Sequence, residues 1–398
     1  MAKYIKVTLK PKKDESLLRF HPWVFSGAIA HMERQPQEGE IVEVYNNNNE
    51  YCGTGHFQLG SIAIRIFSFA KIEPNTNFWT EKIRNAYETR KAIGLVDNDR
   101  TNCFRLIHGE GDTMPGLVID VYDKTAVIQA HSIGMHRIHK ELGEALKSVM
   151  GSNLENIYYK SSTTLPPYFV QQEGVEDYYL CGKDDGQYIA KENGLLFHAD
   201  WIKGQKTGFF IDQRENRALL ERYSKDRSVL NMFCYTGGFS LYAMRGGAKL
   251  VHSVDSSAKA VELTKQNVEL NFKGDERHDA FAEDAFKFLN DMSSQYDLII
   301  LDPPAFAKHR DAIRHALQGY KKLNAKAFEK IKHGGILFTF SCSQAISKEQ
   351  FRLAVFSAAA MSRRNVRILH QLTQPADHPI GIYHPEGEYL KGLVLYVE

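Results

Sequence analysis

The C-terminal half of the chain alternates short apolar runs with longer amphipathic stretches, and this alternation restricts the fold more than any other feature. Six runs have the composition of buried strands: 229–233, 250–255, 297–302, 335–340, 366–372 and 393–397. The segments between them have helical spacing, as in 256–270, where Val261 and Val268 repeat at seven residues. Alternating strands and helices predict an α/β fold: a doubly wound, Rossmann-like sheet with helices on both faces.

The first part of the chain has a different pattern. From residue 5 to about residue 69, short apolar runs alternate with Gly and Asn turns, which predicts a small β barrel or sheet. The next region mixes helical spacing at 78–93 and 136–149 with a hairpin around Tyr122-Asp123-Lys124-Thr125. We therefore predict three domains: a small β domain at 1–72, a mixed α+β domain at 73–188 and the doubly wound domain at 189–398.

Composition narrows the class of protein. A chain of 398 residues with 43% hydrophobic and 25% charged residues is typical of a globular protein of more than one domain. The five cysteines form no CxxC pair, so we predict no zinc ribbon, no disulfide framework and no metal site. The Lys-rich start lacks the apolar stretch of a secretion signal, and no run is long enough to cross a bilayer. We expect a cytoplasmic protein without membrane contact.

Several features of the C-terminal region have the order expected for a nucleoside cofactor. Gly237 and Gly238 follow the first strand, where glycine lets the backbone approach a ligand, and there is no GxGxxG motif for a pyrophosphate. Asp255 ends the second strand, eighteen residues after Gly237, where a carboxylate can bind ribose hydroxyls. Asp284 follows the third strand position, on the adenine side. Together with Asp302-Pro303-Pro304 they indicate S-adenosylmethionine, although each alone is equally typical of a packing turn or a helix cap.

Cys342 and Asp302 end two of the predicted strands. If these strands are neighbours in a parallel sheet, the thiol and the carboxylate lie together at the edge where such sheets bind ligands. That pair suggests one-carbon transfer to a pyrimidine base. The structural alternative for Cys342 is a small buried apolar residue at a strand end.

Several motifs resemble those of the ribosomal RNA large-subunit cytosine-5 methyltransferases that carry an N-terminal PUA domain. They are Arg19-Phe20-His21-Pro22-Trp23-Val24-Phe25, Lys206-Thr207-Gly208-Phe209-Phe210-Ile211-Asp212-Gln213-Arg214, Asp302-Pro303-Pro304-Ala305-Phe306, Phe340-Ser341-Cys342-Ser343, Ala376-Asp377-His378-Pro379 and Tyr389-Leu390-Lys391-Gly392. The resemblance covers essentially the whole chain. It implies a PUA-like RNA-binding domain at 1–72, a methyltransferase domain at 189–398, S-adenosylmethionine as cofactor without a metal, and 23S ribosomal RNA as partner.

The resemblance also implies roles for single residues. The segment 206–214 would form part of a lid over the cofactor. The expected cofactor-binding residues are Phe209, Gln213, Phe233, Tyr235, Gly237, Asp255, Asp284, Ala285 and Asp302. Cytosine C5 is a poor nucleophile until a group adds at C6, and the thiolate of Cys342 would add there to form a covalent adduct. Asp302 would hold N3 or the exocyclic amino group of the base.

RNA recognition is expected at two places. The segment 308–332 contains eight basic residues and only two acidic ones, Asp311 and Glu329, which favours a surface that contacts phosphates. At the N-terminus, lysines combine with aromatic residues, a mixture suited to RNA. The predicted RNA-binding residues are Arg19, His21, Trp23, Lys308, Arg310 and Lys321. An ordinary solvated helix around Lys321 and a core position for Trp23 are equally good interpretations.

Two other functions compete with cytosine-5 transfer. An enzyme that methylates an exocyclic amino group of an RNA guanine or adenine would also use Asp-Pro-Pro, but it has no use for Cys342. A non-catalytic RNA-binding or ribosome assembly factor would have no use for Asp255, Asp284, Asp302 and Cys342 together. The sequence leaves open the nucleotide that is modified, the choice between naked RNA and an assembled particle, the general base, the role of the middle domain and the oligomeric state, for which a homodimer is one option.

Overall fold

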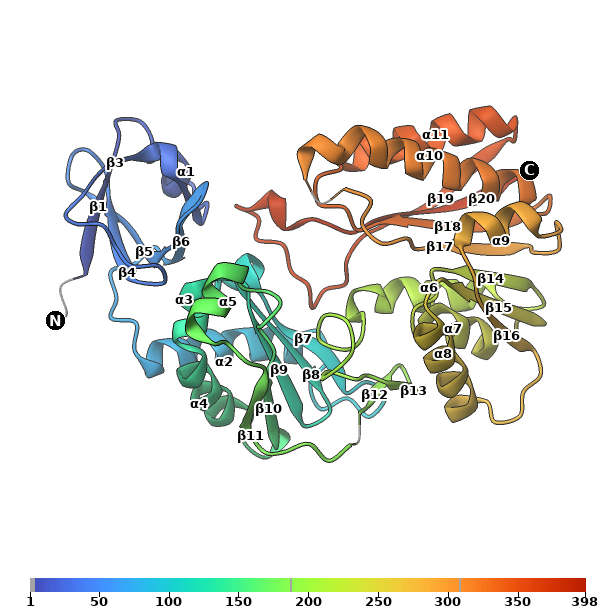
Figure 1. Cartoon of the computed structure of the whole chain (residues 1–398), viewed down its shortest axis with the longest axis horizontal. Helices are drawn as coiled ribbons and strands as arrows, with labels where there is room; N and C mark the ends of the chain where they lie inside the picture. Colours follow the sequence, from blue (N-terminus) through green and yellow to red (C-terminus); the bar gives the residue numbers. More distant parts are fainter. Residues whose placement is uncertain (1–3, 187, 308) are drawn as a thin grey trace. The chain divides into compact units, whose positions relative to one another are not determined.

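Figure 1 shows the computed structural model of the chain, which describes residues 4–186, 188–307 and 309–398. The chain forms two compact units. The first comprises Met1–Asn193, Ala199–Ile211 and Ala376–Gly387, and the second comprises Gly194–His198, Asp212–Pro375 and Glu388–Glu398. Among the described residues, no helix has both the length and the apolar character that a membrane span requires.

The first unit begins with a six-stranded sheet of order β2-β6-β5-β4-β1-β3. Its elements are β1 (Ile5–Leu9), α1 (Glu15–Leu18), β2 (Trp23–Phe25), η1 (Ser26–Ala28), β3 (Ile29–Met32), β4 (Ile41–Tyr45), β5 (Tyr51–Phe57) and β6 (Ile62–Ser68). Residues of β1 and β4 alternate between buried and half-buried positions because successive side chains of a strand point to opposite faces. The prediction of a small β sheet in this region is confirmed.

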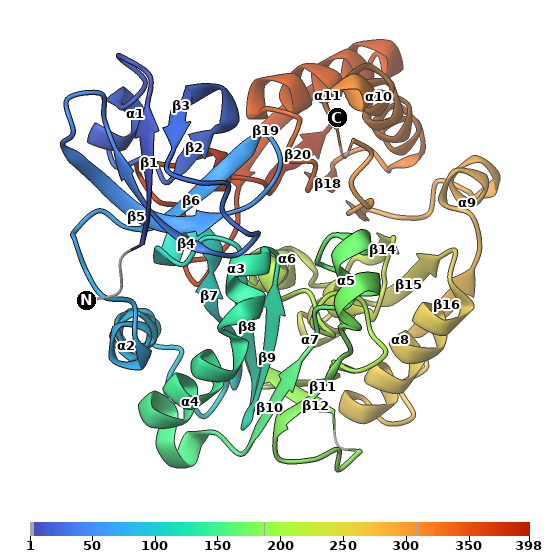
Figure 2. The same cartoon turned by 60° about the vertical axis from the view of Figure 1, so that its left-hand side comes forward.

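A five-stranded sheet of order β11-β10-β9-β8-β7 follows in the same unit. The helices and strands of this part of the chain are α2 (Thr76–Ala92), β7 (Cys103–His108), η2 (Gly109–Asp112), β8 (Leu117–Tyr122), β9 (Thr125–Ala130), α3 (Ile133–Arg137), α4 (His139–Met150), η3 (Gly151–Asn153), β10 (Asn156–Tyr159), α5 (Pro167–Glu173), β11 (Tyr178–Cys181) and β12 (Ile189–Glu192). Helices α2 and α4 lie beside this sheet (Figure 2), and their apolar residues belong to one buried cluster with residues of its strands. The predicted hairpin is β8 and β9, which turn at Asp123 with a φ of 52°.

A buried arginine connects the segment Ala376–Gly387 to the rest of the first unit. The guanidinium of Arg90, on α2, forms two hydrogen bonds with the Asp112 carboxylate, and it also donates to the carbonyls of Arg105 (2.7 Å) and Asp377 (2.8 Å). The Asp377 carboxylate in turn accepts the backbone N–H of Arg105 at 3.0 Å. The segment, which includes η6 (Pro385–Gly387), is therefore held by hydrogen bonds to strand β7 and helix α2.

The second unit contains a seven-stranded sheet of order β16-β15-β14-β17-β18-β20-β19, in which β20 alone is antiparallel to its neighbours. The helices and strands of this unit are β13 (Leu195–His198), α6 (Arg214–Tyr223), β14 (Ser228–Met232), α7 (Gly238–Arg245), β15 (Leu250–Asp255), α8 (Ala258–Asn271), β16 (His278–Ala282), α9 (Ala285–Asp291), β17 (Leu298–Leu301), η5 (Arg310–Ala312), α10 (Ile313–Lys330), β18 (Gly335–Ser341), α11 (Lys348–Ser362), β19 (Val366–Leu372) and β20 (Lys391–Val397). The short helix η4 (Ile211–Gln213) lies at the unit boundary.

Helices cover both faces of this sheet. In Figure 1, α6, α7 and α8 lie on one face and α9, α10 and α11 on the other. Alternate strand residues such as Leu230, Met232, Ile299 and Leu301 belong to a buried cluster with the second group of helices. The predicted doubly wound α/β fold is confirmed, and all six predicted strands are present within two residues of their expected ends. The division into three domains stays a prediction.

The Arg90 contact gives a test of what holds the first unit together. We expect Arg90→Met to lower the free energy of unfolding of this unit by about 3–5 kcal/mol, because the Asp112 carboxylate, whose side chain is 6% exposed, loses its counter-charge. Urea-induced unfolding followed by circular dichroism would measure the change. The matched control is Arg84→Met on the same helix, whose ion pair with Glu81 is exposed and should contribute less than about 0.5 kcal/mol. Equal losses in the two variants would contradict the assignment.

Candidate active site

The centre of the seven-stranded sheet is the place where its strand order reverses. From β14 the chain continues to β15 and β16 on one side, and then returns to β17 and β18 on the other. Loops diverge at such a point and leave a crevice at the carboxyl ends of the strands. The register places Met232 opposite both Val254 and Leu301, and Leu301 opposite Thr339. The loops that follow these four strands therefore leave the same edge of the sheet.

The loop after β14 has an unusual backbone. Phe233, Tyr235 and Gly237 have φ values of 59°, 46° and 79°, in the left-handed region that costs a residue with a side chain roughly 1–2 kcal/mol. Helix α8 supports this conformation, since the Thr264 hydroxyl donates to the Tyr235 carbonyl at 2.8 Å. A Cβ atom on Gly237 would lie 2.6 Å from Thr264, so the position requires glycine. The clash with Thr264 is a packing reason for glycine, and the close approach of a ligand to this backbone stays a prediction.

Asp255, at the end of β15, lies directly beside this loop. Its Oδ2 accepts the backbone N–H of Tyr235 at 3.1 Å, and its Oδ1 accepts that of Ser257 at 2.9 Å. These two bonds fix the orientation of the carboxylate. Each oxygen retains a second lone pair, which is the acceptor that a ribose hydroxyl needs. Asp255 therefore fits the cofactor role predicted for it.

Asp284 and Ala285 begin helix α9, next to β16. The Asp284 carboxylate caps the helix by accepting the backbone N–H of Lys287 at 2.9 Å, and Ala285 is buried. The backbone of this turn is tied to β15, because the N–H of Glu283 donates to the Asp255 carbonyl at 3.0 Å. The cap and the predicted contact with adenine are compatible, since only Oδ1 is used by the cap.

Gln213 and Phe209, the two residues predicted for the lid, fall in different units. Gln213 is buried in the second unit, where its Nε2 donates to Asp302 Oδ2 at 3.1 Å and its Oε1 accepts from Asn216 at 2.6 Å. The structure therefore brings Gln213 together with Asp302. Phe209 is buried in the first unit, where its carbonyl accepts from the Tyr122 hydroxyl at 3.3 Å.

Asp302 follows β17 and begins the Asp302-Pro303-Pro304 turn. Burial, and next the carboxylate of Asp212, raise the pKa of Asp302 to about 7, while the Gln213 amide and the Arg217 guanidinium oppose this increase. Asp212 is itself oriented by the Tyr389 hydroxyl, which donates to Oδ2 at 2.7 Å. A carboxyl group with a pKa near neutrality can both accept and donate a proton at physiological pH.

Cys342 lies one residue beyond β18 and is partly exposed. Its thiol is directed to the carbonyl of Pro303, with 3.9 Å between sulfur and oxygen. Burial, and then the carboxylates of Asp302 and Asp212, raise the pKa of the thiol to about 12. The predicted pairing of Cys342 with Asp302 at one edge of the sheet is therefore present, and the Asp302 carboxylate makes ionisation of the thiol harder.

The Cys342 loop is fixed to the Asp302 loop through Ser343. The buried Ser343 hydroxyl accepts the backbone N–H of Ala307 at 3.3 Å and lies 3.0 Å from the Tyr320 hydroxyl. Sequence reasoning missed Ser343 and Tyr320, and it also missed Asp212. Asp212 and Ser343 had a signal, because they lie inside the motifs 206–214 and 340–343, whereas Tyr320 had none.

The residues predicted to bind RNA differ in how exposed they are. In the N-terminal sheet, Arg19 is exposed, and Trp23 is half-buried and donates from Nε1 to Glu110 at 2.8 Å. An open cavity of about 310 Å³ adjoins Trp23, lined also by Lys13 and the exposed Phe25.

The second predicted surface lies around α10. Lys321 is half-buried there, whereas Lys326 pairs with Glu329, Lys330 donates to the carbonyls of Asn290 and Met292, and Lys332 pairs with Asp297. Lys308 and the side chain of Arg310 lie outside the described part of the chain. Several positive charges of this region are thus already neutralised or bonded within the protein, which weakens the argument for a continuous phosphate-binding surface.

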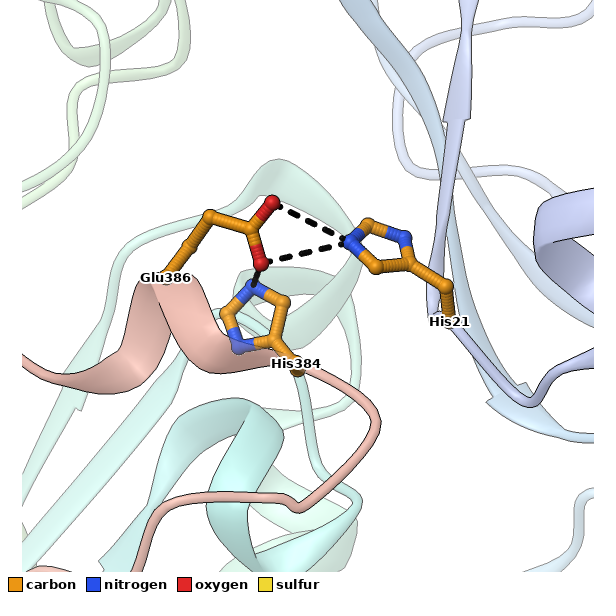
Figure 3. A group of neighbouring side chains, drawn as sticks. All are labelled: His21, His384 and Glu386. Atoms are coloured by element: carbon orange, nitrogen blue, oxygen red, sulfur yellow. Dashed lines mark hydrogen bonds and ion pairs between the residues drawn. The ribbon is translucent and has the colours of Figure 1, made fainter.

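Among the described residues, one group of side chains has atoms placed closely enough to hold a metal ion: His21, His384 and Glu386, all in the first unit (Figure 3). His21 Nε2 lies 3.4 Å from both carboxylate oxygens of Glu386, and His384 Nε2 lies 3.8 Å from one of them. The backbone N–H of Trp23 donates to His21 Nδ1 at 3.3 Å, so the proton of the neutral ring is on Nε2 and faces Glu386. This arrangement is that of a hydrogen-bonded pair rather than of a metal ligand set.

Comparison with known proteins defines the family. A family model described as S-adenosylmethionine-dependent methyltransferase matches residues 171–382, and one described as PUA-like domain matches residues 7–69. Proteins called ribosomal RNA large subunit methyltransferase I are similar over nearly the full length. That of Alteromonas mediterranea is 38% identical, with 98% of each chain covered, and that of Vibrio vulnificus strain CMCP6 is 36% identical, with 97% of each chain covered.

Solved structures share the fold. A chain from Streptococcus mutans, described as a candidate SAM-dependent methyltransferase, aligns with a TM-score of 0.84 at 22% identity, covering 98% of this chain and 100% of that one. A candidate methyltransferase solved with S-adenosylhomocysteine aligns with a TM-score of 0.85 at the same identity and coverage. The cofactor is S-adenosylmethionine. The chain therefore belongs to the S-adenosylmethionine-dependent methyltransferases, in the family of the relatives called ribosomal RNA large subunit methyltransferase I.

Proposed function

We propose that this protein transfers a methyl group from S-adenosylmethionine to C5 of a cytosine in large-subunit ribosomal RNA, with Cys342 as the covalent nucleophile. The names of its relatives support ribosomal RNA as substrate, and the PUA-like match at the N-terminus supports RNA binding. The observation that carries the cytosine-5 assignment is the placement of a thiol beside an acid with a pKa of about 7 at the cofactor edge of the sheet.

The protonation states of the two groups suggest how attack begins. At neutral pH the thiol of Cys342 holds its proton, and Asp302 is divided between acid and carboxylate. The thiol proton passes to the Asp302 carboxylate as sulfur forms a bond to C6 of the cytosine. The neutral acid then donates to N3, where negative charge develops. The thiol proton thus moves by way of Asp302 to N3, and it returns to the Asp302 carboxylate when the aromatic ring is restored.

The remaining steps complete the transfer. Addition at C6 makes C5 an enamine-like carbon, and bound S-adenosylmethionine supplies the methyl group that this carbon accepts. A base then removes the C5 proton, and the C6–S bond breaks to restore the aromatic ring and the thiolate. Asp255, Tyr235, Gly237 and Asp284 would hold the cofactor's nucleoside, while Gln213 orients Asp302.

We also propose the three domains 1–72, 73–188 and 189–398. Two observations support the division between the first two of these domains: the PUA-like match ends at residue 69, and each sheet of the first unit has its own apolar cluster. The residues Arg19, His21, Trp23, Lys308, Arg310 and Lys321 remain the proposed RNA contacts. Of these, Trp23 has the best support, because this aromatic residue adjoins an open cavity of about 310 Å³ and bases stack on aromatic side chains.

Loss of the nucleophile tests the proposal directly. We expect Cys342→Ala to lower methyl transfer to 23S ribosomal RNA by at least about 10³-fold while S-adenosylmethionine still binds, because C6 then has no partner. Transfer of a radiolabelled methyl group, with calorimetry for the cofactor, measures both effects. The control is Cys181→Ala, a thiol of the other unit, which should leave transfer unchanged.

A second experiment traps the adduct. RNA containing 5-fluorocytosine should form a denaturation-resistant complex with the unmodified enzyme, because fluorine replaces the C5 proton that must leave before the C6–S bond can break. Full turnover by Cys342→Ala would instead favour methylation of an exocyclic nitrogen.

The pH dependence tests the shared proton. If the active form holds one proton across Asp302 and Cys342, single-turnover rates should rise with pH up to about 7, where Asp302 loses its proton, and then level off. Above that pH the gain in thiolate is cancelled by the loss of neutral acid. In Asp302→Asn only the thiol titrates, so the rate should be lower but should continue to rise above pH 7. A plateau that persists in Asp302→Asn would assign the titration to another group.

A further inference from the structure

Lys391 is a buried lysine that the reaction described above does not use. It is the first residue of β20 and lies opposite Ser341, the last residue of β18. The residue is 4% exposed, and its Nζ donates to the carbonyls of Ser343 at 2.7 Å and Ile346 at 2.8 Å. Among the described residues, no carboxylate forms an ion pair with it. Glu388 favours the charged form of Lys391 but is paired with Lys348. Burying an ammonium group with no carboxylate in contact is costly, so an apolar residue would serve packing better.

The two carbonyls that Lys391 binds belong to the loop that carries the nucleophile. Ser343 directly follows Cys342, and Ile346 lies just before helix α11. One ammonium group thus bonds to both ends of the short segment 343–346. The same segment is bonded to the Asp302 loop through the Ser343 hydroxyl. Lys391 therefore fixes the segment that directly follows the nucleophile.

The charge of Lys391 also acts on the thiol. Burial lowers the pKa of Lys391 to about 8, so the group is mainly protonated at neutral pH, and interaction with Cys342 favours its charged form. In return, Lys391 lowers the pKa of the Cys342 thiol against the opposite effects of burial, Asp302 and Asp212. Of the side chains that influence the thiol, Lys391 is the one that favours the thiolate.

We propose that Lys391 is a positioning residue for the nucleophile: its ammonium group holds the Cys342 loop by two carbonyl hydrogen bonds and stabilises the negative charge that develops on sulfur. The inference rests on the proposed function, since it gives Cys342 a role as nucleophile. It has a consequence that needs neither RNA nor methyl transfer, namely the reactivity of the Cys342 thiol toward an alkylating agent.

Three substitutions separate the two effects of Lys391. Lys391→Arg keeps the positive charge, Lys391→Gln keeps an N–H donor for the carbonyls without the charge, and Lys391→Met removes both. Lys348→Met is the matched control, because Lys348 begins α11, pairs with the half-buried Glu388 and carries the same charge without contacting the loop carbonyls.

The experiment is iodoacetamide alkylation of the full-length protein across a pH series, with the Cys342 peptide quantified by mass spectrometry. Thermal melting and S-adenosylmethionine binding check that each variant is folded. Near neutral pH we expect Lys391→Gln and Lys391→Met to react roughly tenfold more slowly at Cys342, because an opposite charge at close range shifts a pKa by about one unit or more. Lys391→Arg and Lys348→Met should react at nearly the unmodified rate.

Two results would overturn the inference. Unchanged alkylation of Cys342 in both Lys391→Gln and Lys391→Met would show that the charge does not act on the thiol. Equal slowing in Lys391→Arg and Lys391→Gln would show that only the shape of the loop matters. If Lys391→Met does not fold, the alkylation rates of Lys391→Gln and Lys391→Arg still show whether the charge acts on the thiol. A negative result here is separate from a failure of the proposed function, which would instead appear as methyl transfer by Cys342→Ala.

Discussion

The pairing of β17 with β18 and of β18 with β20 is the constraint on which the site depends. Leu301 lies opposite Thr339, and Ser341 lies opposite Lys391, so the register of three neighbouring strands sets the positions of the carboxyl, the thiol and the ammonium groups. A shift of one residue in either pairing would turn a strand's side chains to the opposite face and separate these groups. The apolar residues of all three strands resist such a shift because they fill the core beneath helices α9, α10 and α11.

Burial strengthens the interactions within the site, but it also raises the pKa values of Asp302 and Cys342, so that both groups ionise less readily. The same low dielectric that keeps the thiol of Cys342 protonated also strengthens its interactions with Asp302 and Lys391. Burial, and next the neighbouring Asp212 carboxylate, raise the pKa of Asp302 to about 7, and Gln213 fixes its orientation. A solvent-exposed thiol and carboxylate would instead titrate near their ordinary pKa values and largely independently of each other.

Much of the fold was accessible from the sequence because it depends on local pattern. Apolar runs with helical segments between them predicted the strands, and the turn residue Asp123 marked a hairpin that is present. The juxtaposition of Asp302 and Cys342 was also predictable, since the two residues end strands that were expected to be parallel neighbours. The contacts of Gln213 with Asp302, Tyr389 with Asp212 and Tyr320 with Ser343 were not predictable, because each joins segments that are far apart in the chain or separated by a helix.

The sequence by itself determined which elements form, their order, and the chemical groups that end each strand, because hydrophobic periodicity and turn residues act over short distances along the chain. Only the tertiary structure decided the protonation of those groups. The pKa values of Asp302, Cys342 and Lys391 depend on how completely water is excluded and on which charges lie nearby, and both are set by packing between elements rather than by any one of them.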